Sequence, residues 1–136
     1  MKKLLIVVGS KNDISHLSEA IKLFKKSKID FQTKVISAHR NIETLVKELE
    51  PKKLEKNNVK VVFAVAHSVS NLPAIIAGYL KDTNISVVGV GLTKSDSDTI
   101  ASTLSVLSIP TGIPLANFGV NQTGLHNAAL FCIKLL

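Results

Sequence analysis

The 136-residue sequence predicts an α/β fold: a three-layer α/β/α sandwich around a five-stranded parallel sheet of flavodoxin-like order 2-1-3-4-5. Two observations support this prediction. Five short apolar, β-branched runs recur along the chain, and helix-length segments separate them. Three of the runs are almost continuously apolar, which is typical of parallel strands covered on both faces. We expect residues 1–136 to form one domain, since a chain of this length buries its own core.

The expected strands are KLLIVVG (3–9), FQTKVIS (31–37), VKVVFAVA (59–66), ISVVGVG (85–91) and PLANFGV (114–120). The opening run is too short for a secretion signal and leads into Gly-Ser-Lys-Asn-Asp, so we expect a buried first strand there. No run approaches the roughly 20 apolar residues of a membrane helix, so no membrane partner is expected.

The segments between these strands have the length and periodicity of helices. They are 13–28, 41–57, 71–80, 98–108 and 124–136. In the second segment, Asn41 is the expected N-cap, and Pro51 is expected to kink or end the helix. In the first two segments the apolar side chains fall on one stripe, which predicts a buried face: Ile14, Leu17, Ile21 and Phe24, then Ile42, Leu45, Val46 and Leu49.

The net charge of +7 lies entirely in residues 1–60, which hold 14 basic and 7 acidic side chains. These lysines alternate with Glu on helical faces, which indicates a solvated surface and no nucleic-acid partner. Residues 61–136 hold three Lys and three Asp, too few charges for a monomer's surface, so we expect a homo-oligomer. A single cysteine, Cys132, favours a reduced, cytoplasmic protein without a disulfide framework.

Ligands of a parallel α/β sheet bind beyond the carboxyl ends of its strands. The polar residues of this chain gather in the loops expected there: Ser10, Asp13, Ser37, His39, Arg40, His67, Ser68, Ser70 and Asn71. The GSKND turn (9–13) fits either a phosphate loop or simple helix capping. It is neither a Walker motif nor a dinucleotide fingerprint. The third strand ends in Ala66-His67 rather than Asp, which excludes a response-regulator receiver.

Arg40 is the only arginine among 17 basic residues, and it follows His39. Its planar fork suits a phosphate, and a histidine can move a proton near neutral pH. Chance also explains a His-Arg pair. The histidines lack an H-x-x-x-H spacing, so no metal is expected. His67 is either a ligand contact or an ordinary loop histidine.

Taken in order, GSKND, SAHR, LPA, SVLSIPTGIPLA and NAAL resemble the PurE family of N5-carboxyaminoimidazole ribonucleotide mutases over essentially all 136 residues. The family pattern is G-S-x-S-D, then S-A-H-R, then A-G-x-G-G-A-A-H-L-P-G, M-P-x-G-I-P-V and N-A-A-L. The resemblance implies a homo-octamer that acts on a small ribonucleotide without metal, biotin or ATP. It implies that the carboxylate leaves N5 as CO2 and re-adds at C4 of the imidazole.

The resemblance also implies roles for individual residues. His39 is implied as the catalytic acid–base. The implied substrate contacts are Ser10 and Asp13 at the ribose phosphate and Arg40 at the phosphate. Further candidate substrate contacts in the same loops are Ser37, His67, Ser68 and Asn71. The related carboxylases tend to have Lys in place of Arg40, which favours the mutase. A phosphoribosyl-binding protein without mutase activity, or a carboxylase of a related nucleotide, are the alternatives.

The segment AVAHSVSNLPA (64–74) departs from the family pattern. Val65, His67 and Ser68 occupy glycine positions, and Asn71 replaces the loop histidine. Three further changes are Val69 and Ser70 for Ala-Ala and Ala74 for Gly. These larger side chains are expected to reshape the end of the pocket that holds CO2.

Overall fold

The computed structural model describes residues 2–68 and 71–136, and within them the chain forms a five-stranded parallel sheet of order β2-β1-β3-β4-β5. The predicted strand order is therefore confirmed. The strands are β1 (Lys3–Val8), β2 (Asp30–Val35), β3 (Val59–His67), β4 (Ser86–Leu92) and β5 (Ala116–Val120).

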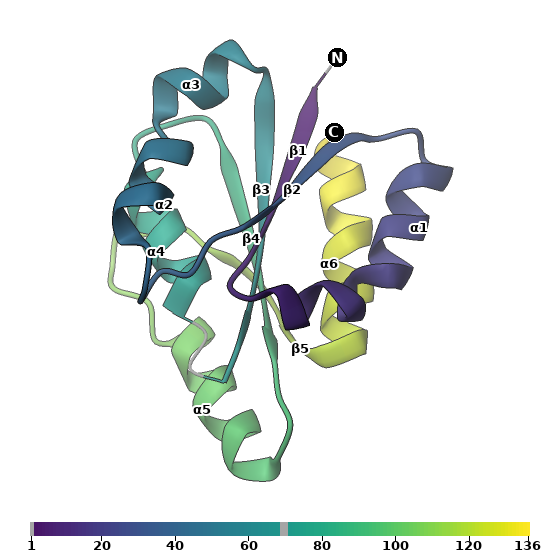
Figure 1. Cartoon of the computed structure of the whole chain (residues 1–136), viewed down its shortest axis with the longest axis vertical. Coiled ribbons are helices and arrows are strands. Elements are labelled where there is room, and N and C mark those ends of the chain that lie inside the picture. Colours follow the sequence, from purple (N-terminus) through teal and green to yellow (C-terminus); the bar gives the residue numbers. More distant parts are fainter. Residues whose placement is uncertain (1, 69–70) are drawn as a thin grey trace.

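Helices cover both faces of this sheet, which confirms the three-layer sandwich. α1 and α6 lie on one face, and α2 to α5 lie on the other (Figure 1). The helices are the 3-10 helix η1 (Lys11–Leu17), α1 (Ser18–Lys26), α2 (Ile42–Glu48), α3 (Pro51–Lys56), α4 (Asn71–Tyr79), α5 (Asp96–Leu107) and α6 (Asn121–Leu135). None of the helices in the described ranges has the length and apolar character needed to cross a membrane.

The first predicted helix, 13–28, is divided into η1 and α1. Ser10 begins η1, and its Oγ accepts the Asn12 backbone N–H at 3.3 Å. The predicted apolar stripe is wrong at Ile14, whose side chain is 38% exposed, while Asp13 is buried in its place. A 3-10 helix has three residues per turn rather than 3.6, so the α-helical stripe does not extend into η1.

The second predicted helix, 41–57, ends before Pro51, where α3 begins. Proline suits the first turn of a helix because its missing N–H has no intrahelical acceptor there. Asn41 holds the N-cap position of α2, but its side chain makes no capping hydrogen bond within the described residues. Leu45 and Leu49 are buried as predicted, whereas two members of the predicted stripe are exposed: Ile42 and Val46.

The core consists of two apolar clusters, one on each face of the sheet. β1 and β3 contribute to both, because alternate residues of a strand point to opposite faces. Leu4, Ile6 and Val8 pack under α1 and α6, while Leu5 and Val7 pack under α2 to α4. β1 is therefore buried along almost its whole length, as the unbroken apolar sequence predicts.

At two positions inside these layers the identity of the residue matters for packing or chemistry. Cys132 of α6 is fully buried in the first cluster, and its burial raises the pKa of the thiol to about 12. On the other face, a Cβ at Gly89 of β4 would lie 2.7 Å from the Cβ of Pro73. Glycine at this position therefore lets the start of α4 approach the sheet closely.

Glu48 joins three elements of the second face. Its carboxylate accepts hydrogen bonds from Lys34 of β2 and, at 2.8 Å, from Lys53 of α3. The hydrogen bonds from Lys34 and Lys53, together with their charges, lower the pKa of Glu48 to about 2. A lowered pKa means that ionised Glu48 stabilises the folded state above pH 4.5, its ordinary value, and that this contribution is lost as the pH falls towards 2.

We therefore expect Glu48→Gln to lower the free energy of unfolding by about 1 kcal/mol at pH 7. The difference from the unchanged protein should shrink between pH 4.5 and pH 2. Urea unfolding across this pH range measures it, with exposed Glu55→Gln on α3 as the control. An equal loss in both variants, or a loss that does not vary with pH, would contradict the role of the lysine pair.

Candidate active site

A small polar pocket lies at the carboxyl ends of β1, β2 and β3, where the sheet order reverses. Loops that leave neighbouring strands in opposite directions form a crevice at such a point. The pocket has a volume of about 110 Å³. It is lined by Gly9, Ser10, Asp13, Ser37, Ala38, His39, Ala66, His67 and Leu72.

Asp13 of η1 is the deeply buried charged residue of this pocket, with 2% of its surface exposed. Its Oδ1 lies 3.2 Å from Nδ1 of His67, at the end of β3. Its Oδ2 is buried and makes no hydrogen bond with any described residue. A buried carboxylate is costly without hydrogen-bond partners. The His67 imidazole is the partner of Oδ1, and Oδ2 has none among the described residues.

Asp98 is a neighbour of this pair that the sequence analysis did not single out. Its Oδ2 lies 3.9 Å from His67 Nε2 and accepts the Lys94 backbone N–H at 3.1 Å. Asp98 sits in the first turn of α5, where its own N–H donates to the N-cap Ser95. The loop after β4 was expected at this edge, but nothing local in its sequence distinguishes Asp98 from Asp96.

His39 lies in the turn after β2, at the margin of the pocket, and its side chain is exposed. The Asn71 amide nitrogen lies 3.3 Å from His39 Nε2. In this orientation of the amide its nitrogen donates and Nε2 accepts. Asn71, at the position of the family's loop histidine, is thus a hydrogen-bond neighbour of His39.

Arg40 is exposed and does not line the pocket. Its backbone N–H donates to Ser37 Oγ at 3.3 Å, and the Asn41 N–H donates to the Ser37 carbonyl at 2.9 Å. These bonds close the SAHR turn and place Arg40 beside His39 at the carboxyl edge. The long side chain can reach an anion over the pocket mouth from there.

Ser68 adopts a backbone conformation that favours glycine. Its φ is 55°, in the left-handed region, and its N–H donates to the Leu92 carbonyl at 3.0 Å. A left-handed φ at this position is a physical reason for the glycine of the family pattern. Ser68 and Asn71 do not line the pocket, and the predicted changes at Val69 and Ser70 lie outside the described residues.

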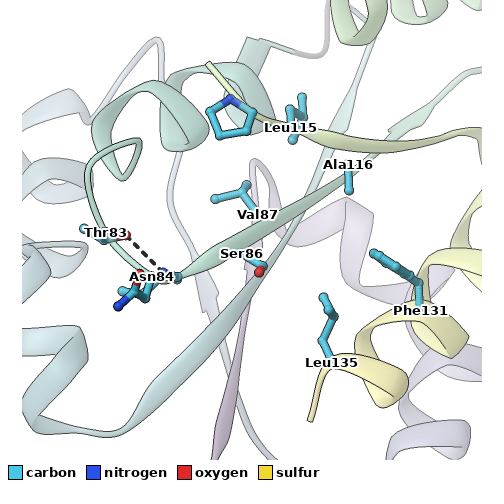
Figure 2. Close-up of a pocket in the computed structure, with 10 residues that line it drawn as sticks. Thr83, Asn84, Ser86, Val87, Leu115, Ala116, Phe131 and Leu135 are labelled. Atoms are coloured by element: carbon cyan, nitrogen blue, oxygen red, sulfur yellow. Dashed lines mark hydrogen bonds between the residues drawn. The ribbon is translucent and has the colours of Figure 1, made fainter. Parts of the chain in front are cut away.

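A larger cavity, of about 520 Å³, lies at the opposite edge, beside the first residues of β4 and β5 (Figure 2). Val87, Leu115, Phe131 and Leu135 form much of its wall, and Thr83 Oγ1 accepts the Ile85 N–H at 3.1 Å. Its lining contains no Asp, Glu, His, Lys or Arg among the residues described. Acid–base chemistry therefore belongs to the smaller pocket.

The residues that could bind a metal are spread out. In the ranges 2–68 and 71–136, no group of three or more His, Cys, Asp or Glu side chains is arranged to hold an ion. The smaller pocket instead combines hydroxyl groups, an imidazole and a buried carboxylate, a set suited to binding hydroxyls and moving protons.

A parallel α/β sandwich with such a pocket at the reversal of strand order belongs to the broad class of doubly wound α/β proteins, whose ligands bind at this edge. The particular family is defined by sequence. The model of the family described as AIR carboxylase matches residues 3–136, and the chain belongs to that family.

Two curated relatives illustrate the similarity. The N5-carboxyaminoimidazole ribonucleotide mutase of Saccharolobus solfataricus is 33% identical over 136 residues, which cover all of this chain and 82% of the relative. The mutase of Pseudomonas aeruginosa is 32% identical over 131 residues, 96% of this chain and 77% of the relative.

A solved structure has a similar fold. The crystal structure of Treponema denticola PurE superimposes with a TM-score of 0.75 at 22% identity, and covers 97% of this chain and 78% of that one. At this identity the likeness concerns the fold, and it agrees with the five-stranded parallel sheet described above.

Ser68→Gly should raise the free energy of unfolding by about 0.5 kcal/mol, since relief of the left-handed strain exceeds the added entropy of the unfolded chain. Ser68→Val should lower it, because a β-branched side chain tolerates this conformation poorly. Chemical unfolding of the two variants measures both effects. Ser18→Gly, at a helical φ of −55° in α1, is the control and should be destabilising.

Proposed function

We propose that this chain is an N5-carboxyaminoimidazole ribonucleotide mutase, an isomerase of purine biosynthesis that moves a carboxylate from N5 to C4 of the imidazole. The observation that supports it most directly is the position of His39. The histidine of the SAHR motif lies at the margin of a pocket lined by Ser10, Asp13 and Ser37, within hydrogen-bond distance of Asn71. Curated relatives at 32–33% identity have this activity in their names.

The proposed substrate binds with its ribose phosphate towards the ends of β1 and β2. The hydroxyls of Ser10 and Ser37 and the guanidinium of Arg40 hold the phosphate, since a planar fork pairs with two phosphate oxygens. The open Oδ2 of Asp13 accepts hydrogen bonds from ribose hydroxyls. The 110 Å³ pocket is smaller than usual for a complete ligand site, so the imidazole extends out of it past His39.

His39 moves the proton in this proposal. It donates a proton to N5 of the carbamate, and the N–C bond breaks to release CO2 and the neutral amine. C4 of the ring then attacks the retained CO2, and His39 removes the proton that C4 carried. One proton leaves His39 and one returns, so no redox partner or net proton is required. Holding CO2 and the ring in register supplies much of the rate enhancement.

Two observations bear on the alternatives. Arg40, rather than the lysine typical of the related carboxylases, favours the mutase. His67, in a glycine position, adds a side chain to the pocket lining, so the second candidate is a protein that binds a phosphoribosyl ligand without moving CO2. A direct assay with N5-carboxyaminoimidazole ribonucleotide separates the two. Nucleotide binding by the unchanged protein without turnover would reject the mutase and support the binding protein.

We further propose a homo-oligomer, an octamer by resemblance, that works in the cytoplasm. One face of α5 supports self-association. Ile100, Leu104 and Leu107 are 63%, 56% and 62% exposed and follow one another at helical spacing. Large apolar side chains gathered on one face are typical of a subunit interface.

His39→Asn should lower kcat at least about 100-fold, because an amide cannot take and return a proton. Its affinity for the ribonucleotide should stay within about threefold, since phosphate and ribose contacts are made by other residues. Steady-state kinetics and calorimetric binding measure the two quantities, with exposed His126→Asn on α6 as the control. Normal turnover by His39→Asn would exclude His39 as the proton carrier.

The double variant Ile100→Lys, Leu104→Lys should dissociate the oligomer, because a new pair of charges would be buried at the interface. Light scattering after size exclusion measures the mass. Leu130→Lys, at a 42% exposed position of α6, is the matched control and should keep the mass of the unchanged protein. A monomeric unchanged protein, or a double variant of unchanged mass, would contradict the interface.

A further inference from the structure

His67 replaces a glycine of the family pattern, and it lies between two carboxylates from different elements. Nδ1 is 3.2 Å from Asp13 Oδ1, and Nε2 is 3.9 Å from Asp98 Oδ2. Asp13 belongs to η1, His67 to the end of β3, and Asp98 to the first turn of α5. The ring therefore connects three segments that are far apart in the sequence.

The Asp13 carboxylate depends on this ring for its orientation. It is 98% buried, which follows from its 2% exposure, and His67 is the hydrogen-bond partner of its side chain among the residues described. A carboxylate held through one oxygen cannot rotate freely about its terminal bond. Oδ2 is thereby kept buried beneath the pocket that Asp13 lines, without a hydrogen-bond partner in the described chain. A buried acceptor in this state favours a ligand that donates hydrogen bonds.

Asp98 lies beyond the opposite edge of the imidazole, but its Oδ2 is 3.9 Å from Nε2, too far for a hydrogen bond, and the buried Nε2 has no hydrogen-bond partner among the described residues. The Oδ2 of Asp98 is fixed by the Lys94 backbone N–H, and its position by the N-cap of α5. Only 20% of the side-chain surface of His67 and of Asp98 is exposed, so neither group is free to swing into solvent. The orientation of the ring is therefore set by its burial and by the contact of Nδ1 with Asp13.

We propose that His67 is a positioning residue of the substrate site: its Nδ1–H holds Asp13 Oδ1, so that Oδ2 faces the pocket and accepts the ribose hydroxyls of the nucleotide. The inference rests on the proposed function, because it assumes a ribonucleotide in this pocket. His67 acts through Asp13 and does not itself contact the substrate. A glycine at position 67 has no side chain to supply this hydrogen bond.

Two substitutions of His67 distinguish a hydrogen bond made by Nδ1 from one made by Nε2. The amide nitrogen of Asn is as far along its side chain as Nδ1, so His67→Asn keeps a donor for Asp13. The amide of Gln corresponds to Nε2, so His67→Gln loses that donor. Titration calorimetry with 5-aminoimidazole ribonucleotide should show binding weakened about tenfold in His67→Gln and less than about threefold in His67→Asn. In kinetics the loss should be in KM, with kcat nearly unchanged.

A second ligand pair tests whether the effect passes through a ribose hydroxyl. The unchanged protein should bind ribose 5-phosphate more tightly than 2-deoxyribose 5-phosphate, and His67→Gln should lose most of this preference. His126→Gln, exposed on α6, is the control for the histidine change itself. Circular dichroism and thermal melting establish that each variant is folded before it is titrated.

The outcomes are distinct. Equal losses in His67→Asn and His67→Gln, or an unchanged preference for ribose in His67→Gln, would overturn the positioning role. Nucleotide binding without turnover in the unchanged protein would reject the mutase, while the binding comparison would still decide the role of His67. No nucleotide binding by the unchanged protein would overturn both.

Discussion

The parallel pairing of β1 with β2 and β3 decides where this protein can hold a ligand. Val8 lies opposite Val35 on one side and Val65 on the other, so β1 and β2 end at the same level and β3 runs two residues further. The next residues are tied together as well, since the Gly9 N–H donates to Val65 and the Ile36 N–H donates to Val8. Loops that are distant in the sequence therefore leave the sheet side by side. Every polar side chain of the pocket is placed by this common edge.

The pocket at this edge requires the carboxylate of Asp13 to be buried beside the apolar core, which is energetically costly. Asp13 follows a fully buried strand and turns inward from a 3-10 helix. A glycine at position 67 has no side chain to contact that carboxylate. In this chain the His67 imidazole lies 3.2 Å from it, and Asp98 of α5 lies 3.9 Å from the other edge of the ring. The change from glycine to histidine is therefore accompanied by neighbours that accommodate it.

The strands and their order were predictable from sequence because continuous apolar runs leave little choice to a doubly covered parallel sheet. The stripe through Ile14 was not predictable, since a 3-10 turn is not distinguished from an α-helix by apolar spacing. The pocket residues were predictable as members of one edge. Their pairing was not: Asp13 and His67 are 54 positions apart, and no local pattern identifies Asp98 as the third member. The roles of His39 and Arg40 follow from a resemblance and stay predictions.

Cys132 has a consequence for following the protein's motions. Its thiol is buried under the first face of the sheet, and the pKa of about 12 leaves almost no thiolate at neutral pH. A thiol reagent can therefore modify this chain only when the packing around α6 opens. Because the chain contains a single cysteine, the rate of modification reports the opening of that one helix without any engineered probe. The rate of Cys132 modification therefore measures the local stability of the packing on the sheet face opposite α2 to α5.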